Sequence, residues 1–292
     1  MCNINDANWI YNRGNYEPEN ICAEGLLRFI YENPVGGASL SHLIKRKSLS
    51  RLYGHYCNTG FSARKIPQFI RRYNIDMRGC KWDYDSFTDF FTREKSGIAF
   101  PAEHRVLGSP CEGLATVFAD LNSDFVIAAK GSYFTLRELF GSEKLAAAYN
   151  GGTMLKIRLA PANYHRMHFF DDGKIITSKL INGDLHSVNP IAVKQIARLY
   201  CQNKRALILY KTRNFGSVAI VEVGATFVGS IAHCFKNGDK VRRGQCGSYF
   251  KPGGSLILVF FQEGRFTPAN PLTEQSRKGF ESVVGVGEIL GV

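Results

Sequence analysis

A glycine-rich turn ending in a serine is the stretch of this chain best suited to unusual chemistry. Pro252-Gly253-Gly254-Ser255 runs directly into the apolar residues 256–261, which are typical of a buried strand. Glycine adopts backbone conformations closed to other residues, so strain can be stored beside the serine hydroxyl. A serine placed there can attack the preceding carbonyl, and elimination from the resulting ester leaves a pyruvoyl group. An ordinary turn before a strand has the same pattern, so a reactive serine also requires side chains that activate it, its chemical companions.

Two histidines are the first candidate companions. His165 and His168 lie three positions apart in Tyr164-His165-Arg166-Met167-His168. They would share one face of a helix but point to opposite faces of a strand. A pair on one helical face could bind a metal, with Asp171 or Asp172 as a further ligand, and a structural role is the alternative.

A carboxylate is the second candidate companion. Glu112 lies in a turn bounded by Pro110 and Gly113. Such a group could orient a histidine, as the acid does in a Ser-His-Asp triad. Activation of a serine nucleophile requires all three groups in contact, and sequence spacing does not establish that contact.

The elements that must position these residues fall into two parts, which divide near Gly97. Before it, apolar spacing predicts helices at 26–31, 40–44 and 66–73 and a capped short helix with an aromatic face at 85–91. After it, short apolar runs between turn residues predict strands, interrupted by helices at 136–149 and 191–200. The predicted strands are 115–118, 125–128, 153–159, 174–180, 206–210, 218–223, 227–232 and 256–261. We therefore expect an α+β fold in which a helical N-terminal part, 1–97, packs on a β-rich catalytic body, 98–292.

Composition excludes several classes of protein. The chain has 292 residues with 45% hydrophobic and 21% charged residues, as in an ordinary globular protein. No apolar run approaches the roughly 18 residues that span a bilayer, and the N-terminus has no secretory signal pattern. The eight cysteines form no Cys-x-x-Cys pair, so we expect reduced thiols and no zinc site.

The net charge of +12 is concentrated early in the chain. Basic residues between positions 45 and 81 alternate with aromatic and aliphatic ones, which is typical of a surface that docks on an anionic membrane. A solvated helical face is the plainer alternative, and a DNA-reading helix fits this mixture less well. We expect no nucleic-acid partner.

Several segments, in the same order, resemble motifs of the phosphatidylserine decarboxylase family over nearly the whole chain. The match at 159–168 is the most distinctive, and Gly254-Ser255 falls where the family cleaves itself. The other matching segments are 87–94, 109–113, 183–190 and 221–225.

The resemblance implies a self-processing enzyme. Ser255 would attack the carbonyl of Gly254 and become the pyruvoyl group that heads a small piece, 255–292. His168 would take the serine proton and would be oriented by Glu112. The pyruvoyl cofactor would then form a Schiff base with phosphatidylserine, and His165 would assist decarboxylation or protonate the carbanion. The products would be phosphatidylethanolamine and carbon dioxide.

The resemblance also implies partners and a location. We expect a peripheral enzyme on the cytoplasmic face of a cell membrane. The oligomeric state stays open, with a homodimer as one option. The competing hypotheses are a pyruvoyl decarboxylase of a soluble amino acid or peptide, a non-enzymatic module that binds nucleic acid or a membrane, and an inactive membrane-binding paralogue.

The chain departs from the family near the processing site. Position 112 is Glu where the family usually has Asp, so the carboxylate sits one methylene further out. Asn163 stands where an acidic residue is frequent, and Cys246 lies near the place of an expected glutamate. Pro252 and Leu256 also replace more common residues beside the cleavage turn.

Overall fold

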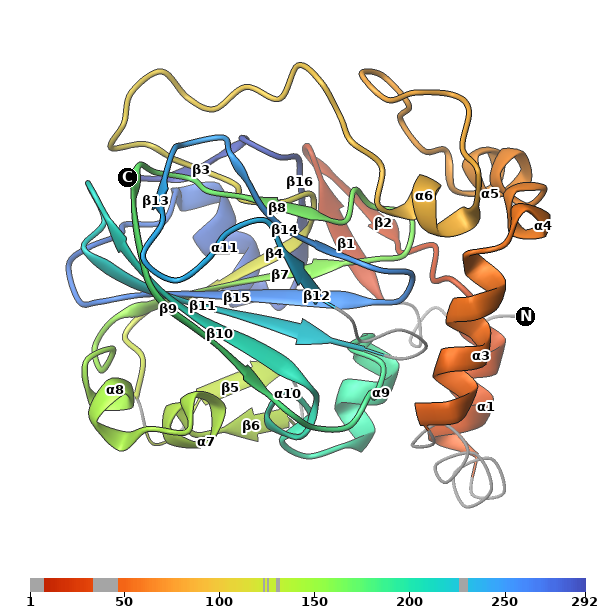
Figure 1. The fold of residues 1–292 in the computed structure, drawn as a ribbon. Helices are drawn as coiled ribbons and strands as arrows, with labels where there is room; N and C mark the ends of the chain where they lie inside the picture. Colours follow the sequence, from red (N-terminus) through yellow and green to blue (C-terminus); the bar gives the residue numbers. More distant parts are fainter. Residues whose placement is uncertain (1–7, 34–46, 123, 125, 130–131, 226–230) are drawn as a thin grey trace.

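A large twisted sheet dominates the computed structural model, which describes residues 8–33, 47–122, 124, 126–129, 132–225 and 231–292 (Figure 1). Neighbouring strands of this sheet are antiparallel except for the parallel pair β1 and β16. In spatial order the ten strands within the described residues are β13 (Lys240–Val241), β9 (Gly173–Ile181), β10 (Arg205–Thr212), β11 (Ser217–Gly224), β15 (Ser255–Phe261), β7 (Thr153–Leu159), β4 (Gly113–Phe118), β16 (Glu281–Val284), β1 (Trp9–Asn12) and β2 (Asn15–Pro18).

The centre of the sheet is buried on both faces. β15 lies between β11 and β7, and all seven of its residues are buried. Because side chains alternate along a strand, Ile257, Val259 and Phe261 pack into one apolar cluster and Leu256, Leu258 and Phe260 into another on the opposite face. An uninterrupted apolar run is therefore required here, as the sequence predicts.

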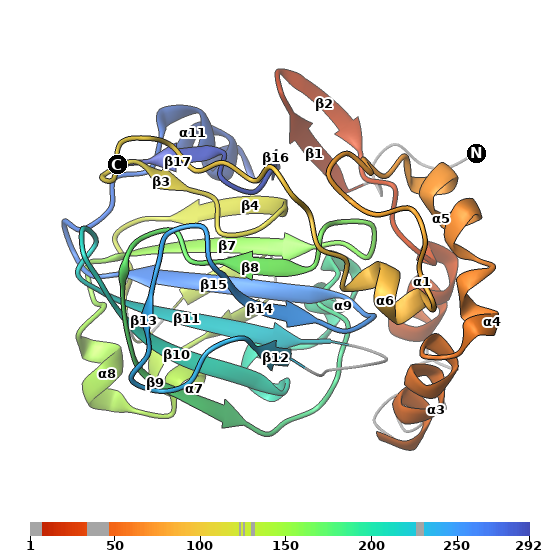
Figure 2. The same cartoon turned by 45° about the horizontal axis from the view of Figure 1, so that its top comes forward.

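Different elements cover the two faces. A small sheet of order β12 (Ile231–His233), β14 (Cys246–Phe250) and β8 (Arg166–His168) covers the face that carries Ile257 (Figure 2). Short helices cover the other face: α7 (Leu136–Phe140), α8 (Glu143–Ala147), α9 (Pro190–Gln195) and α10 (Leu199–Gln202). Two small pairs, β3 (Leu107–Gly108) with β17 (Ile289–Gly291) and β5 (Val126–Ala129) with β6 (Ser132–Phe134), and helix α11 (Asn270–Lys278) complete the body.

Helices of the N-terminal part lie beside one end of the large sheet (Figures 1 and 2). They are α1 (Glu24–Glu32), α3 (Lys47–Cys57), α4 (Gly60–Ala63), α5 (Ile66–Tyr73) and α6 (Phe87–Phe91). The predicted capped helix is confirmed as α6, since the Ser86 side chain accepts a hydrogen bond from the Asp89 backbone at 3.1 Å.

This part is not purely helical, because β1 and β2 extend the large sheet. β1 pairs with β16, more than 260 residues away in the chain, as in the partners Ile10 and Glu281. Local periodicity carries no information on such a pairing, and all four residues of β2 are exposed. The sequence therefore offered little signal for these strands.

The predicted α+β class is confirmed, but two predicted long helices are wrong. The segment 136–149 forms α7 and α8, separated at Gly141, whose φ of 68° ends the first helix. The segment 191–200 forms α9 and α10, separated by extended Ile196 and by Arg198 at φ 57°. The predicted helix at 40–44 lies outside the described residues, as does most of the predicted strand at 227–232. Within the described part, no helix is long and apolar enough to cross a bilayer.

Candidate active site

Ser255 is the first residue of the central strand β15. It pairs with Leu159 on β7 and with Gly224 on β11, and its side chain is 1% exposed. The turn before it contains buried Pro252 and half-buried Gly253, and the φ of 151° at Gly253 favours glycine. The peptide bond between Gly254 and Ser255 is thus held where the turn meets a rigid strand.

The side chain of Ser255 belongs to the face covered by the small sheet. Leu159, its partner on β7, packs with Met167 of β8 and Phe250 of β14 in the apolar cluster on that face. Alternation along β15 places Ser255 on the same face as Ile257. The strand that carries His168 therefore lies over the face to which Ser255 belongs.

His165 is a fully buried, neutral imidazole beside the turn. Its Nδ1 donates a hydrogen bond to the carbonyl of Asn163 at 2.9 Å, and its ring lies 4.0 Å from that of Phe91. Burial lowers the pKa of His165 to about 3, although the carbonyls of Asn163 and Gly253 oppose the shift. Within the described part of the chain Nε2 has no hydrogen-bond partner. The Gly253 carbonyl lies near the ring, and it would favour the protonated form of His165.

His168 has both ring nitrogens engaged. Nδ1 donates a hydrogen bond to the carbonyl of Gly244 at 2.9 Å. In the neutral ring Nε2 therefore accepts a hydrogen bond from the Tyr164 hydroxyl, 3.1 Å away. Burial lowers the pKa of His168, and the Gly244 carbonyl opposes this effect. The His168 backbone donates to the carbonyl of Pro110 at 2.8 Å, which joins β8 to the loop of Glu112.

Glu112 contacts the histidine segment through Asn163. Glu112 Oε1 accepts a hydrogen bond from Asn163 Nδ2 at 3.0 Å, and the backbone carbonyl of Asn163 holds His165. No hydrogen bond among the described residues joins Glu112 to His168, or either residue to Ser255. The predicted proton path through these three residues stays a prediction.

The histidines do not share a helical face, because Arg166, Met167 and His168 form strand β8. In the described residues, no group of three histidine, cysteine or acidic side chains is arranged to hold a metal ion. Asp171 is instead bonded to Asn214, whose backbone and side-chain nitrogens donate to its carboxylate.

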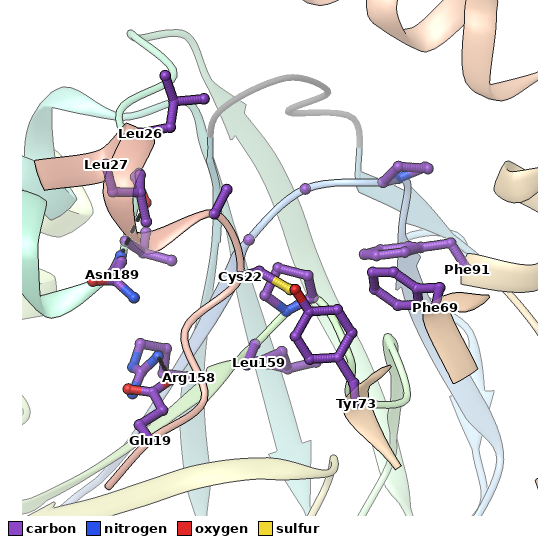
Figure 3. A pocket seen from close by; sticks show the side chains of 18 of the residues that line it. Glu19, Cys22, Leu26, Leu27, Phe69, Tyr73, Phe91, Arg158, Leu159 and Asn189 are labelled. Carbon is purple, nitrogen blue, oxygen red and sulfur yellow. Dashed lines mark hydrogen bonds and ion pairs between the residues drawn. The ribbon is translucent and has the colours of Figure 1, made fainter. Parts of the chain in front are cut away.

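A cavity of about 370 Å³ runs from the turn to the N-terminal helices (Figure 3). Its apolar wall comes from α1, α5 and α6, and the residues 252–254 form part of its lining. Figure 3 shows Phe69 and Phe91 together on one side, Leu26 and Leu27 on the opposite side, and Arg158 beside Glu19. The cavity is therefore largely apolar, with charged groups at one end.

Those charged groups largely neutralise one another. Arg158 donates to both carboxylate oxygens of Glu19 at 2.8 and 2.9 Å, and its Nε donates to Glu281 at 3.1 Å. Exposed Arg72, by contrast, lies over the ring of Tyr73 at 5.6 Å. Arg72 is a cation at the rim of the cavity that is available to an anionic group.

Comparison with known proteins agrees with this arrangement. The family model described as phosphatidylserine decarboxylase matches residues 84–290. The chain is 38% identical over 289 residues to the phosphatidylserine decarboxylase proenzyme of Clostridium botulinum (strain Alaska E43 / Type E3), covering 97% of this chain and 98% of that protein. The chain belongs to the phosphatidylserine decarboxylase family. It is a carboxy-lyase, and the predicted resemblance is confirmed.

Two further relatives have nearly the same extent. The proenzyme of Clostridium beijerinckii is 40% identical over 97% of this chain and 98% of its own length. That of Ruminiclostridium cellulolyticum is 37% identical over 97% of this chain and 96% of its own length. The similarity thus includes the N-terminal helices as well as the body.

Sequence reasoning missed several residues of this decarboxylase site. In the sequence Tyr164 is only one member of a motif, yet its hydroxyl donates a hydrogen bond to His168. Arg93 is buried and its Nη2 donates to the carbonyls of Ala162 and Asn163 at 3.4 and 3.3 Å, so the motif 87–94 supports the histidine segment. The order of the motifs along the chain was a signal of function, but not of these contacts.

A fully buried carboxylate also lies on the face of Ser255. Glu222 of β11 is fully buried and bonds His233 Nε2 at 2.8 Å, and it accepts a hydrogen bond from Ser248. It lies two residues before Gly224, the partner of Ser255, which makes it a diagonal cross-strand neighbour of that serine. The link between the two sheets is thus polar near Ser255.

Proposed function

We propose that this enzyme cleaves itself between Gly254 and Ser255 and then converts phosphatidylserine to phosphatidylethanolamine and carbon dioxide. The observation that carries the proposal is the cavity that ends at residues 252–254. An apolar cavity with a cationic rim suits a phospholipid whose amino-acid headgroup must reach the new chain end. The relatives are phosphatidylserine decarboxylase proenzymes, which supports both halves of the proposal.

In the first reaction the Ser255 hydroxyl attacks the Gly254 carbonyl. The serine loses a proton, the amide nitrogen gains one, and the acyl group of Gly254 moves from nitrogen to oxygen. Loss of the Cα proton of Ser255 and departure of the Gly254 carboxylate then leave a dehydroalanine residue. Its imine tautomer takes up water and releases ammonia, which converts residue 255 into the covalent pyruvoyl cofactor. The large piece is 1–254 and the small piece is 255–292.

The residues around the turn suit a pyruvoyl group. Ser255 is nearly inaccessible to solvent, and His165 presents a buried Nε2 without a hydrogen-bond partner in the described part of the chain. A pyruvoyl group supplies a ketone that condenses with the substrate amine and an electron sink for the loss of carbon dioxide.

We assign proton removal from Ser255 to His168, with Glu112 as its support, and proton transfer during decarboxylation to His165. The geometry adds a condition to this assignment. Nε2 of His168 must release the Tyr164 hydroxyl before it can take another proton. His165 is the competing base, because its Nε2 has no hydrogen-bond partner among the described residues.

We further propose that the N-terminal helices dock on the cytoplasmic face of an anionic membrane. Phe61 and Trp82 are each 71% exposed and Leu52 is 68% exposed, although apolar side chains of this size are usually buried. Arg64 lies over the ring of Phe61 at 5.1 Å, so the surface combines apolar and cationic groups. Docking there would bring the cavity to the lipid headgroups. We also propose a homodimer. The mass of the purified protein in solution distinguishes a dimer from a monomer.

The decisive experiment combines intact mass with a vesicle assay. We expect two pieces that separate at Gly254, a pyruvoyl terminus at position 255, and carbon dioxide release from phosphatidylserine vesicles. Ser255→Ala should remain one chain without activity, whereas Ser282→Ala should process normally because the buried Ser282 hydroxyl has no partner within the described residues. An unprocessed wild-type chain would contradict self-cleavage. Activity on free serine but not on vesicles would instead favour a decarboxylase of soluble substrates.

A further inference from the structure

Two thiols meet on the small sheet that covers Ser255. Cys234 follows β12 and Cys246 begins β14, and their sulfur atoms are 3.9 Å apart. The backbone of Cys234 donates to the carbonyl of Gly247 at 2.8 Å, so the two cysteines lie on directly hydrogen-bonded segments. Among the described cysteines, this is the pair whose thiols contact each other.

The distance is short enough for a covalent bond after a small movement. A disulfide requires sulfur atoms about 2.05 Å apart and Cα atoms usually within about 4.4–6.8 Å. Antiparallel pairing continues from Ile231 with Phe250 to His233 with Ser248, which brings Cys234 opposite Gly247. The strand irregularity between Cys246 and Ser248 provides local freedom for Cys246 to turn toward Cys234.

The two thiols have different environments. Cys234 is exposed, so an oxidant can reach it, whereas Cys246 is half-buried. Burial raises the pKa of Cys246 to about 11, but Arg166 Nη1 donates to its sulfur at 3.6 Å and favours the thiolate. Cys234 is thus suited to react first and Cys246 to complete the bond.

We propose that Cys234 and Cys246 are a modification site that forms a reversible disulfide with a low-molecular-weight disulfide as the oxidant. The thiolate of Cys234 attacks one sulfur of the oxidant and releases one small thiolate. The thiolate of Cys246 then attacks the Cys234 sulfur and releases the second. The protein loses two protons and two electrons, and the oxidant gains them as two small thiols.

The proposed bond lies beside the active-site strand. Cys246 is the strand partner of His168 on β8, and the Arg166 that contacts its sulfur also donates to the carbonyl of Thr92 at 2.7 Å. Oxidation would remove the thiol from Arg166 and tie β14 to the end of β12. The inference does not depend on self-cleavage, because both cysteines precede Gly254.

The test uses the reduced full-length protein and oxidised glutathione. After treatment, free thiols are alkylated in denaturant and the protein is digested with trypsin without reduction. Because trypsin cuts after Lys236 and Arg243, the two cysteines fall on separate peptides. We expect the intact protein to lose two hydrogen atoms and a linked peptide pair to carry Cys234 and Cys246. A thiol reductant should restore both alkylation sites.

Two serine variants complete the design. Cys234→Ser should abolish the linked pair, and Cys201→Ser, a half-buried cysteine of α10, should leave it unchanged. Full alkylation of both thiols after oxidation would overturn the proposal. So would a stable mixed disulfide at Cys234 alone, or a linked peptide pair that persists in Cys234→Ser.

Discussion

The Tyr164 hydroxyl donates a hydrogen bond to Nε2 of His168 at 3.1 Å, and the two rings stack with their planes 19° apart. The tyrosine therefore occupies the nitrogen that would have to take the proton of Ser255. Burial lowers the pKa of His168, and a hydrogen bond donated to a neutral imidazole acts in the same direction, because it stabilises the neutral form.

Removal of this hydroxyl should change the pH dependence of self-cleavage. In the wild-type chain burial keeps the pKa of His168 below its ordinary value, so the base form persists as the pH falls below about 6.5. Tyr164→Phe should raise that pKa, and the rate of self-cleavage should then begin to fall at a higher pH than in the wild type. Pulse-labelled protein from cell-free synthesis, followed by denaturing electrophoresis at several pH values, measures the shift. Identical acid limbs in the two proteins would rule out this role of Tyr164.

Substitution of each histidine should affect a different reaction. His168→Ala should slow self-cleavage by about 100-fold or more, the usual size of a general-base contribution. His165→Ala should still cleave but should lose about 100-fold in decarboxylation. The exposed His104 is a matched control, and His104→Ala should retain both reactions. If His165→Ala stayed uncleaved and His168→Ala cleaved normally, His165 rather than His168 would be the base for self-cleavage.

The rate of self-cleavage should depend more on the charge of the side chain at position 112 than on its length. Glu112→Gln keeps the size but weakens the acceptor for Asn163, and we expect self-cleavage to slow by about 10- to 100-fold, as for a misplaced catalytic group. Glu112→Asp retains the carboxylate and should stay within about tenfold of the wild type. The half-times of precursor disappearance give both values. Equal rates for wild type and Glu112→Gln would show that the charge has no role.

The ion cluster of Arg158 should hold the small piece to the large one. Arg158 lies between Glu19 and Glu281, and only Glu281 belongs to the piece 255–292. Arg158→Met would leave the buried Glu19 carboxylate without this cation and Glu281 with Lys156 alone, so we expect a loss of about 3–5 kcal/mol in the free energy of unfolding. Chemical denaturation measures this loss.

The exposed pair of Lys278 and Glu274 provides the control, since Lys278→Met should leave the midpoint unchanged. Equal midpoints for Arg158→Met and wild type would contradict the role of the cluster.

The same cluster predicts the behaviour of the protein in acid. Burial would raise the pKa of Glu281, but Arg158 and Lys156 outweigh this effect and lower it to about 2. Because the folded-state pKa lies below the unfolded value of about 4.3, the stabilisation is present above that value. The stabilisation contributed by ionised Glu281 should disappear as the pH falls toward 2. Unfolding midpoints measured between pH 5 and 2, with Glu281→Gln as the comparison, should converge at the acid end; parallel curves would contradict the assignment.

Exposed apolar side chains should determine membrane docking. Phe61→Ser should weaken binding to vesicles that contain anionic lipid by about tenfold or more, because burial of one aromatic side chain contributes about 1.5–3 kcal/mol. Vesicle sedimentation measures the change. Exposed Tyr133 lies on β6, away from the proposed docking helices, and Tyr133→Ser is the control that should bind as the wild type does. Unchanged binding by Phe61→Ser would argue against this surface.

The amino-acid sequence predicted the elements whose signal is local. The run 153–159 and the segment 66–73 appear in the structure as β7 and α5 with those same bounds, because apolar periodicity reflects which face each element buries. The helix at 136–149 failed where Gly141 adopts a left-handed conformation, which the periodicity does not register. β1 escaped prediction because its pairing with β16 depends on residues at the opposite end of the chain.

By itself the sequence determined the family of this protein and its candidate reactive residues, since motif order and residue type are properties of the chain. Only the tertiary structure decided their contacts. It joined Glu112 to Asn163 and Tyr164 to His168, left His165 Nε2 without a hydrogen-bond partner in the described part of the chain, and set the cavity of the N-terminal helices against the turn. These relationships arise where strands and loops distant in sequence pack together, and packing is a property of the whole fold.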